Sequence, residues 1–333
     1  MFMPCEFPID IVITWVDGDD PAHRAKRFSY MPEGAAMRRD EVAGETRYRQ
    51  SGEILLCVAS VLRFASFVRK IFIVTDNQNP GLDAFLEKNF PEGSPISIEI
   101  IDHKVIFRGY EHCLPTFNST TITTMLWRIP GLSEHFLLLN DDIFLIAPCS
   151  PRDFYDEDGR PLAYGYWHWA FTARLLRKLR LLRKNSRSLQ FRDMMLNAAD
   201  TLHAKRFVRM QHTPHCFRRS FFEDFFAKHP DILSRQIEHR FRDASQFSAA
   251  CLHYTGLALK GRCRVVSHKD KLIYLQPKAD GTLDGEAKRR LLGASPAAFC
   301  CLNSIDKASS ADRAELMACI AGKIGVELPE GMK

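Results

Sequence analysis

The sequence predicts an α/β protein with a mostly parallel β-sheet whose faces are covered by helices. Three observations lead to this prediction. Short apolar runs rich in β-branched residues recur through the first half of the chain, apolar residues at helical spacing lie between them, and polar residues follow where the runs end. Strand–helix–strand order repeated in this way is typical of parallel sheets with helices on their faces.

Length and composition are those of an ordinary folded protein. The 333 residues include 46% hydrophobic and 26% charged residues, enough for one large domain or two. The ten cysteines are scattered and form no CxxC pair, which indicates reduced thiols in a cytoplasmic protein. No apolar run approaches the ~20 residues that cross a bilayer, and acidic residues interrupt the N-terminal apolar ones. We therefore expect neither a membrane span nor a signal peptide.

The individual elements follow from the local pattern. A first strand is predicted over residues 9–13, where isoleucine and valine dominate, and it runs into an acidic turn punctuated by Gly18 and Pro21. The polar, basic stretch 22–50 is expected to be a loop with some helix. The next elements are predicted as a helix over 53–67, a strand over 70–75, a strand over 96–101 and a helix over 119–128.

The apolar run 137–146 is the most informative segment, because Asn140, Asp141 and Asp142 interrupt it. Its apolar residues predict a buried strand. Buried carboxylates are costly unless they meet a cation or several hydrogen-bond donors. A Mg²⁺ ion held by one or two carboxylates and shared with substrate phosphates is one solution. A turn at the strand end, in which Asp141 or Asp142 caps a following element, is the alternative.

Acidic residues follow three of the predicted strands: Asp17, Asp76 and the pair Asp141–Asp142. Ligands of open α/β sheets bind at the carboxyl ends of the strands, so these acids are placed to meet in one site. Any single one is equally well explained as a turn former. The three together favour a site.

Residues 173–192 form a strongly basic stretch in which leucines recur at helical spacing. Its basic residues are Arg174, Arg177, Lys178, Arg180, Arg183, Lys184, Arg187 and Arg192. A basic amphipathic helix suits an anionic membrane surface or a polyanionic substrate. The alternative is an ordinary packed helix with a solvated basic face. Because no recognisable nucleic-acid-reading module accompanies it, we expect no nucleic-acid partner.

Four blocks of sequence stand out in order between residues 9 and 256: 9–21, 53–80, 114–142 and, more loosely, Thr213–His215 with Arg240–Arg242. Together they resemble the conserved blocks of the Stealth family. These proteins are sugar-phosphotransferases of bacterial capsule synthesis, and the lysosomal-enzyme GlcNAc-1-phosphotransferase is an animal relative.

This chain departs from the family pattern at a few positions. Leu55 and Ala59 stand where the second block usually has arginines, and Thr123 stands where a glutamate is usual. Asp243 is the nearest match to an acidic residue expected after Arg242. These departures affect individual hydrogen-bond donors and acceptors. They therefore bear on which sugar the protein prefers.

The resemblance implies an activity in capsular or exopolysaccharide synthesis. A hexose-1-phosphate or N-acetylhexosamine-1-phosphate is transferred from a UDP-sugar to a glycan hydroxyl, which forms a phosphodiester and releases UMP. The implied cofactor is Mg²⁺, with Mn²⁺ as the alternative. The implied acceptor is a polysaccharide on a lipid carrier, which would place a cytoplasmic enzyme at the inner face of the membrane.

The implied fold is Rossmann-like and related to the GT-A glycosyltransferase arrangement, with a helical, basic C-terminal part. We expect a catalytic core over residues 1–260, with a basic helical insertion at about 165–205. A helical extension is expected over 261–333.

The resemblance also assigns roles to individual residues. Asp141 and Asp142 suit the metal, and Asp17 suits acceptor positioning or metal support. His215 suits a general base, although a lone histidine is more often a capping or core residue. Arg242 suits bidentate contact with phosphate oxygens, although taken alone it would be read as a surface ion-pair partner.

The expected substrate contacts come from polar and aromatic residues near the strand ends. Asn118 and Ser119 have groups that bind sugar hydroxyls or phosphate, and Trp15 suits stacking on a base or sugar ring, with a core tryptophan as the alternative. The full set of expected substrate-binding residues is Trp15, Asp19, Asp76, Gln78, Asn118, Ser119, Asn140 and Arg240.

Two other functions fit the sequence. A metal-dependent glycosyltransferase would break the anomeric bond and release UDP with the same pair of acids. A non-catalytic scaffold of a capsule-assembly complex would need neither Asp142 nor His215 for capsule formation.

Overall fold

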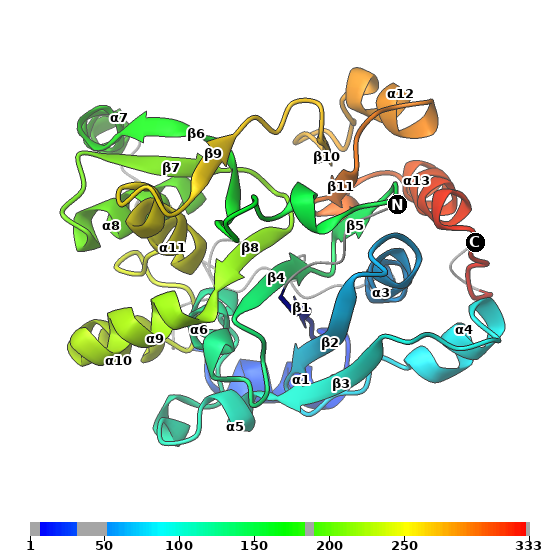
Figure 1. The fold of residues 1–333 in the computed structure, drawn as a ribbon, viewed down its shortest axis with the longest axis horizontal. Helices are drawn as coiled ribbons and strands as arrows, with labels where there is room; N and C mark the ends of the chain where they lie inside the picture. The colour runs from blue at the N-terminus through cyan, green and yellow to red at the C-terminus, as the bar shows by residue number, and fades with distance from the viewer. Residues whose placement is uncertain (1–6, 32–51, 184–189, 331–333) are drawn as a thin grey trace.

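The computed structural model describes residues 7–31, 52–183 and 190–330. Its centre is a five-stranded sheet with the order β3-β2-β1-β4-β8 (Figure 1). Four strands run parallel, and only the edge strand β8 is antiparallel to its neighbour β4. These strands are β1 (Ile9–Thr14), β2 (Val68–Thr75), β3 (Ser97–Asp102), β4 (His135–Asn140) and β8 (His215–Arg218). The predicted mostly parallel sheet is confirmed.

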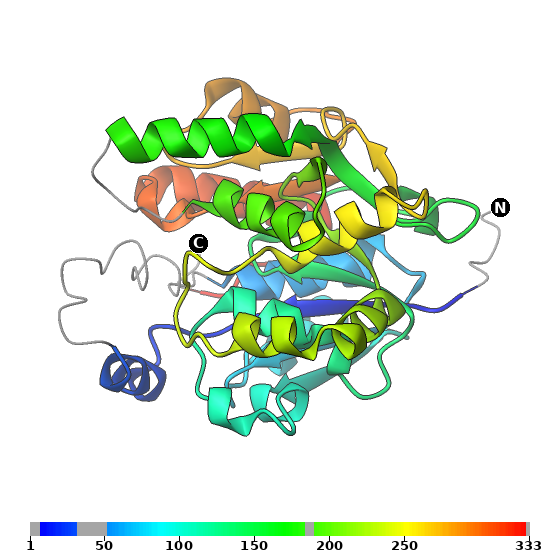
Figure 2. The same ribbon diagram turned by 90° about the vertical axis from the view of Figure 1, so that its left-hand side faces the viewer.

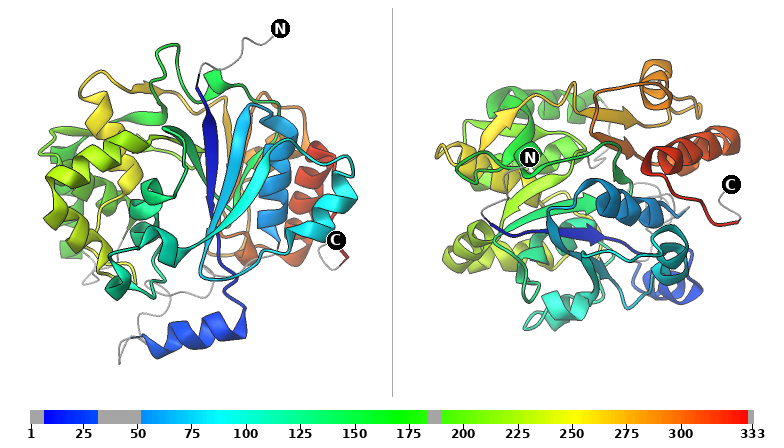
Figure 3. Two further views of the ribbon diagram at one scale, coloured as in Figure 1. Left: turned by 60° about the horizontal axis from the view of Figure 1, so that its bottom comes forward. Right: turned by 45° about the vertical axis from the view of Figure 1, so that its right-hand side comes forward.

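Helices cover both faces of this sheet (Figure 3). Alternate residues of each strand enter two separate cores, as the pleat of a strand requires. Ile11 and Leu137 pack on the side of α3 and α13, whereas Val12 and Leu138 pack on the side of α6 and α11. The helices of the first side are α3 (Glu53–Phe64), α4 (Leu82–Asn89) and α13 (Ser310–Ile324). Those of the second are α5 (His103–Ile106), α6 (Ser119–Met125), α9 (Arg219–Lys228), α10 (Pro230–Ile237) and α11 (Ala249–Ala258).

The apolar run 137–146 is not one strand. Its first part belongs to β4, which ends at Asn140. Its second part is β5 (Ile143–Leu145), a strand of a second sheet of order β10-β11-β5. Asp141 and Asp142 form the turn between the two sheets. The partners of β5 in this sheet come from the far end of the chain and are β10 (Leu272–Leu275) and β11 (Phe299–Leu302).

A third sheet lies at the outer edge of the molecule and carries two helices. It consists of β6 (Leu162–Trp169), β7 (Arg206–Met210) and β9 (Arg264–Val266), and its helices are α7 (Ala170–Arg183) and α8 (Phe191–Thr201). Residues 261–333, expected as a helical extension, thus contribute three strands besides α13 and α12 (Gly285–Leu292). Two of those strands, β9 and β11, pair with strands of the first half of the chain.

One helix forms where the sequence predicted a loop with some helix. α1 (Pro21–Ser29) begins after Asp20, whose side chain accepts hydrogen bonds from the backbone N–H groups of Ala22 and His23. An aspartate at the N-cap and a proline at the first helical position favour this start. Within the described parts of the chain, no helix is long and apolar enough to span a bilayer.

Candidate active site

A cleft of about 470 Å³ lies at the carboxyl ends of the parallel strands. β1 contributes Thr14, Trp15 and Val16 to its lining, and Asn140, Asp141 and Asp142 follow β4. The opposite wall comes from the C-terminal part of the chain, from Gln276 after β10 and from residues 302–307 after β11. Of the acids predicted to meet at the strand ends, Asp141 and Asp142 line this cleft, whereas Asp17 and Asp76 are not among its described lining residues.

Asp141 and Asp142 form an acidic pair at this turn. The pKa of the Asp142 carboxyl is raised to about 7, mainly by burial and in part by the nearby Glu53, against the lowering effect of the Cys301 thiol. Burial also raises the pKa of Asp141 well above its usual range, and the charges of Asp142 and Glu53 add to the effect. The surrounding residues therefore do not stabilise two negative charges at this turn when both carboxyls are ionised.

The backbone fixes the direction of this turn. The Leu302 N–H donates a hydrogen bond of 3.0 Å to the Asp142 carbonyl, and the Cys301 Sγ lies 3.7 Å from Asp142 Oδ2. The other carboxylate oxygen, Asp142 Oδ1, is buried with no hydrogen-bond partner among the described residues. A buried carboxylate oxygen without a donor is expected to meet a ligand.

The acidic pair fits a divalent cation that takes its other ligands from substrate. Among the described residues, no group of three or more histidines, cysteines or carboxylates is placed to hold an ion unaided. Mg²⁺ is commonly bound by one or two carboxylates plus phosphate oxygens and water. The raised pKa values of both carboxyls and the unpartnered Asp142 Oδ1 agree with that mode of binding.

Glu53 is a cleft residue that we did not predict. It is the first residue of α3 and lines the cleft beside the acidic pair. A glutamate at a helix N-terminus is ordinarily explained by the helix dipole, so no separate pattern in the sequence marks Glu53 as a site residue.

Trp15 and Asn140, predicted to contact substrate, both line the cleft. Trp15 is only 4% exposed and donates its backbone N–H to the Val74 carbonyl at 3.0 Å. It thus belongs to the core and to the cleft wall together.

The acidic turn after β1 is organised by Gln78. The Gln78 Oε1 accepts a hydrogen bond from the Asp17 N–H at 2.9 Å, and its Nε2 donates to the Asp17 carbonyl at 2.9 Å and to Asp20 Oδ2 at 3.1 Å. The Asp17 side chain accepts from the Asp19 N–H at 2.9 Å. Asp76 accepts two hydrogen bonds of 2.8 Å from the Lys26 ammonium on α1. The lining of the cleft does not include Asp17, Asp19, Asp76 or Gln78. Their predicted roles stay predictions.

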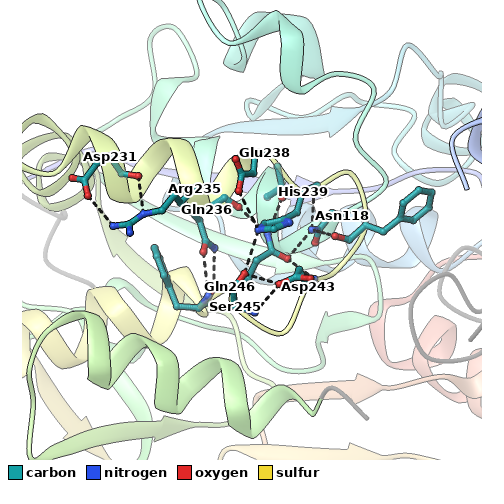
Figure 4. Close-up of polar contacts among 12 residues, drawn as sticks. Asn118, Asp231, Arg235, Gln236, Glu238, His239, Asp243, Ser245 and Gln246 are labelled. Atoms are coloured by element: carbon teal, nitrogen blue, oxygen red, sulfur yellow. Dashed lines mark hydrogen bonds and ion pairs between the residues drawn. The ribbon is translucent and has the colours of Figure 1, made fainter. Parts of the chain in front are cut away.

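Asn118 is fully buried and holds a loop beside the cleft (Figure 4). Its amide donates to the carbonyls of His239 and Phe241 at 3.1 and 2.9 Å and to Gln246 Oε1 at 2.8 Å. Its Oδ1 accepts from the Thr120 N–H at 3.1 Å and so caps the start of α6. The structure thus shows a structural role for Asn118, and its substrate contact stays a prediction.

The loop held by Asn118 carries the two predicted arginines. Arg242 lines the cleft and donates to the Ser119 Oγ at 2.7 Å; Ser119 is also a lining residue. Arg240 turns away, donates to the carbonyls of His112 and Leu114 at 3.2 and 3.1 Å, and stacks over the Tyr30 ring. Arg242 is thus the better placed of the two for a phosphate in the cleft.

His215 lies on β8, beside the cleft but not in its described lining. Burial, with a smaller effect of the neighbouring His212, lowers its pKa to about 3, so the imidazole is neutral at pH 7. The His212 ring stacks on the Tyr274 ring, 4.8 Å between centroids, and the Tyr274 hydroxyl donates to the lining residue Gln276 at 2.8 Å. These contacts connect His212, rather than His215, to the cleft lining, and the role of His215 as a base stays a prediction.

Several other lining residues carried no recognisable sequence signal. His103 is buried, burial lowers its pKa to about 4, and neither ring nitrogen has a hydrogen-bond partner among the described residues. Ser304, at the start of η6 (Ile305–Lys307), has a φ of 53°, which is uncommon for a residue other than glycine. Only the pairing of β11 with β5 brings Ser304 and Lys307 to the acidic pair.

Comparison with known proteins identifies two family regions. Residues 7–35 match the model of Stealth protein CR1, conserved region 1, and residues 47–163 match that of Stealth protein CR2, conserved region 2. The blocks we separated at 53–80 and 114–142 thus fall within a single conserved region.

Relatives named as phosphotransferases match over longer stretches. The exopolysaccharide phosphotransferase cps2G of Lactiplantibacillus plantarum is 32% identical over 274 residues, which covers 76% of this chain and 77% of the relative. The exopolysaccharide phosphotransferase SCO6023 of Streptomyces coelicolor is 33% identical over 259 residues, covering 74% and 40% respectively. The capsular polysaccharide phosphotransferase WcwK of Streptococcus pneumoniae is 39% identical over 155 residues, covering 46% and 43%. The chain spans about half the length, or less, of several curated relatives that it matches.

Solved structures with a similar arrangement share little sequence. The galactosyltransferase LgtC in complex with donor and acceptor sugar analogs aligns with a TM-score of 0.47 at 12% identity, covering 97% of this chain and 98% of that one. A similarity of this size supports no inference about function. The family assignment depends instead on the sequence matches, above all on the extent of the match to cps2G. By these matches, the chain belongs to the Stealth protein family.

Proposed function

We propose that the protein transfers a sugar-1-phosphate from a nucleotide sugar, a UDP-sugar, to a hydroxyl group of a capsular or exopolysaccharide. The observation that carries this proposal is the acidic pair Asp141–Asp142 at the strand ends of the cleft, with the unpartnered Asp142 Oδ1. The names of the relatives add support, because they are polysaccharide phosphotransferases.

The chemistry requires charge neutralisation more than covalent assistance. The acceptor oxygen attacks the phosphorus that carries the sugar, the bond from that phosphorus to the bridging oxygen breaks, and UMP leaves with the electron pair. The anomeric C–O bond stays intact. Asp141 and Asp142 would hold Mg²⁺ or Mn²⁺, which supplies neutralisation of the pyrophosphate charge.

The chain's own residues supply the remaining functions. Arg242, held by Ser119, would bind phosphate oxygens from the side of α6, and Lys307 adds a cation on the opposite wall. Trp15 and Asn140 would contact the donor. We assign proton removal from the acceptor to His215, whose lowered pKa would rise next to the negative phosphates.

The acceptor is proposed to be a polysaccharide on a lipid carrier, and the enzyme a cytoplasmic protein at the inner face of the membrane. Each described cysteine is a free thiol, which agrees with that location. Cys5 lies outside the described residues.

The test is a product analysis with purified protein, Mg²⁺ and a panel of UDP-sugars. Phosphotransfer releases UMP and gives an acceptor-linked phosphodiester, and turnover is expected to stop in excess chelator. Release of UDP would instead identify a glycosyltransferase that breaks the anomeric bond. Undiminished UMP formation in chelator would contradict the role of the acidic pair.

We expect Arg242→Ala to lower kcat/KM by ~10–100-fold, the effect of losing a charge-assisted hydrogen bond to phosphate. Arg242→Lys is expected to recover part of the loss, because a lysine keeps the charge but not the bidentate geometry. The matched control is Arg235→Ala on α10, whose 71% exposed side chain pairs with Asp231 within its own helix. Equal losses for Arg242→Ala and Arg235→Ala would reject the assignment.

A further inference from the structure

The helix α7 turns its apolar side to the outside of the protein. Phe171, Leu175, Leu179 and Leu182 are 71%, 48%, 42% and 73% exposed. Their spacing places them on one face of the helix. We call these four residues the α7 apolar face. Single exposed leucines are ordinary, but a whole exposed helix face of large apolar side chains indicates an interaction surface.

The arginines of α7 explain why this face points outward. Arg174 pairs with Asp200, Arg177 donates to Asn197 Oδ1 at 3.0 Å, and Arg180 pairs with Asp193. All three partners lie on α8, so the basic side of α7 packs against the protein. Arg180 is largely buried in its pair, whereas the Arg174 side chain is 51% exposed, so the predicted alternative of a packed helix with a solvated basic face holds at Arg174 and not at Arg180. Lys184 and Arg187 lie outside the described residues.

An exposed tryptophan and a cation accompany the α7 apolar face. Trp169, which directly precedes α7, is 61% exposed. Lys178, three residues after Leu175 and four before Leu182, is also exposed. Tryptophan and tyrosine are enriched where protein meets the headgroup region of a bilayer, and cations attract anionic lipid.

The position of α7 suits a flat partner. The helix lies along the outer edge of the molecule, away from the central sheet, and its C-terminal end points to the same side as the carboxyl end of β1 (Figure 2).

We propose that the α7 apolar face docks on a lipid surface that contains anionic phospholipid, with the helix lying in the plane of the interface. Helices of this kind place leucine and aromatic side chains at the boundary between headgroups and acyl chains, and basic residues beside them meet anionic headgroups. A second copy of the chain is the alternative occupant, and a dimer that forms without lipid would identify it. This inference does not rest on the proposed phosphotransfer.

The test uses the whole protein and vesicles of defined composition. Wild type is expected to float with vesicles of equal phosphatidylglycerol and phosphatidylcholine and to bind pure phosphatidylcholine more weakly. The variant Phe171→Ser/Leu175→Ser/Leu179→Ser is expected to bind the anionic vesicles at least tenfold more weakly. The matched control is Leu259→Ser/Leu292→Ser, which removes leucines that are 46% and 42% exposed on other parts of the surface and should bind like wild type.

A spectroscopic readout reports the contact directly. Trp169 emission, taken as the difference between wild type and Trp169→Phe, is expected to shift to shorter wavelength on anionic vesicles. Failure of wild type to bind, or equal binding by the triple variant, would overturn the proposal. A lipid-free dimer that the triple variant converts to a monomer would overturn it in favour of a second copy. UMP release on a soluble acceptor should be the same for wild type and the triple variant, which separates this test from that of the phosphotransfer.

Discussion

Replacing Asp142 with asparagine is expected to abolish turnover and, in metal-free protein, to increase stability. The side chain keeps its shape but loses the negative charge that would hold the cation and its bound phosphates. Loss of a central charge-stabilising group typically lowers the rate by ~10²–10³-fold. Initial rates of UMP release, with Mg²⁺ saturating for wild type, measure this effect.

The stability change follows from the raised pKa of Asp142. The folded protein holds the carboxyl proton up to about pH 7, whereas the unfolded chain releases it near pH 4. Between these values the folded state binds more protons than the unfolded state, so stability falls as pH rises through that window. Asp142→Asn has no carboxyl to ionise and does not lose stability in this way. Its free energy of unfolding at pH 8 should therefore exceed that of wild type by ~1–3 kcal/mol, less than the full pKa shift corresponds to, because the carboxyl is partly solvated.

Denaturant unfolding in excess chelator at pH 5 and pH 8 checks the prediction. The free energy of unfolding of Asp142→Asn should exceed that of wild type by a small amount at pH 5 and by a larger amount at pH 8. Asp231→Asn, which removes an exposed carboxylate on α10, is the matched control and should leave turnover unchanged. A folded Asp142→Asn protein with normal turnover, or one less stable than wild type at pH 8, would contradict the assignment.

Asn118→Ala is expected to lower the free energy of unfolding by ~3 kcal/mol. The change removes a buried amide from the carbonyls of His239 and Phe241 and from Gln246, and it removes the cap of α6. Buried acceptors left without a donor cost ~1–3 kcal/mol, and loss of an N-cap costs ~1 kcal/mol. Chemical unfolding followed by circular dichroism measures the loss.

The control for Asn118 is its neighbour Ser119. Ser119→Ala removes an exposed hydroxyl that lines the cleft and binds Arg242, so it should alter KM more than stability. If Asn118→Ala kept wild-type stability and raised only KM, the residue would be a substrate contact and the structural role would be wrong.

The central sheet was predictable because its strands are short apolar runs with acids at their ends. The run 137–146 was predicted as one strand, because its apolar pattern continues on both sides of Asp141 and Asp142. Hydrophobic periodicity indicates which residues are buried, and both β4 and β5 are buried. It does not indicate that the chain leaves one sheet and enters another at the acidic pair.

The site was predictable where its residues follow strands of the central sheet or match the family blocks, as Ser119 and Arg242 do. Ser304 and Lys307 enter the cleft through a pairing between strands more than a hundred residues apart, which no local pattern encodes. Gln78 and Asn118 have the chemistry of substrate ligands, but the structure shows their amides bonded within the protein. The orientation of α7 was equally hidden, because the sequence does not show that Arg174 and Arg180 pair with carboxylates of α8 and that Arg177 donates to the Asn197 amide oxygen.

The joining of β5 to β11 has a consequence for how the chain can be divided. The conserved region over 47–163 includes β5, but among the described strands β5 is paired only with β11 (Phe299–Leu302). That region is therefore not an independent folding unit. The shortest fragment able to form the cleft reaches at least to Lys307, and expression of the conserved regions alone would leave an unpaired, apolar strand directly after the acidic pair.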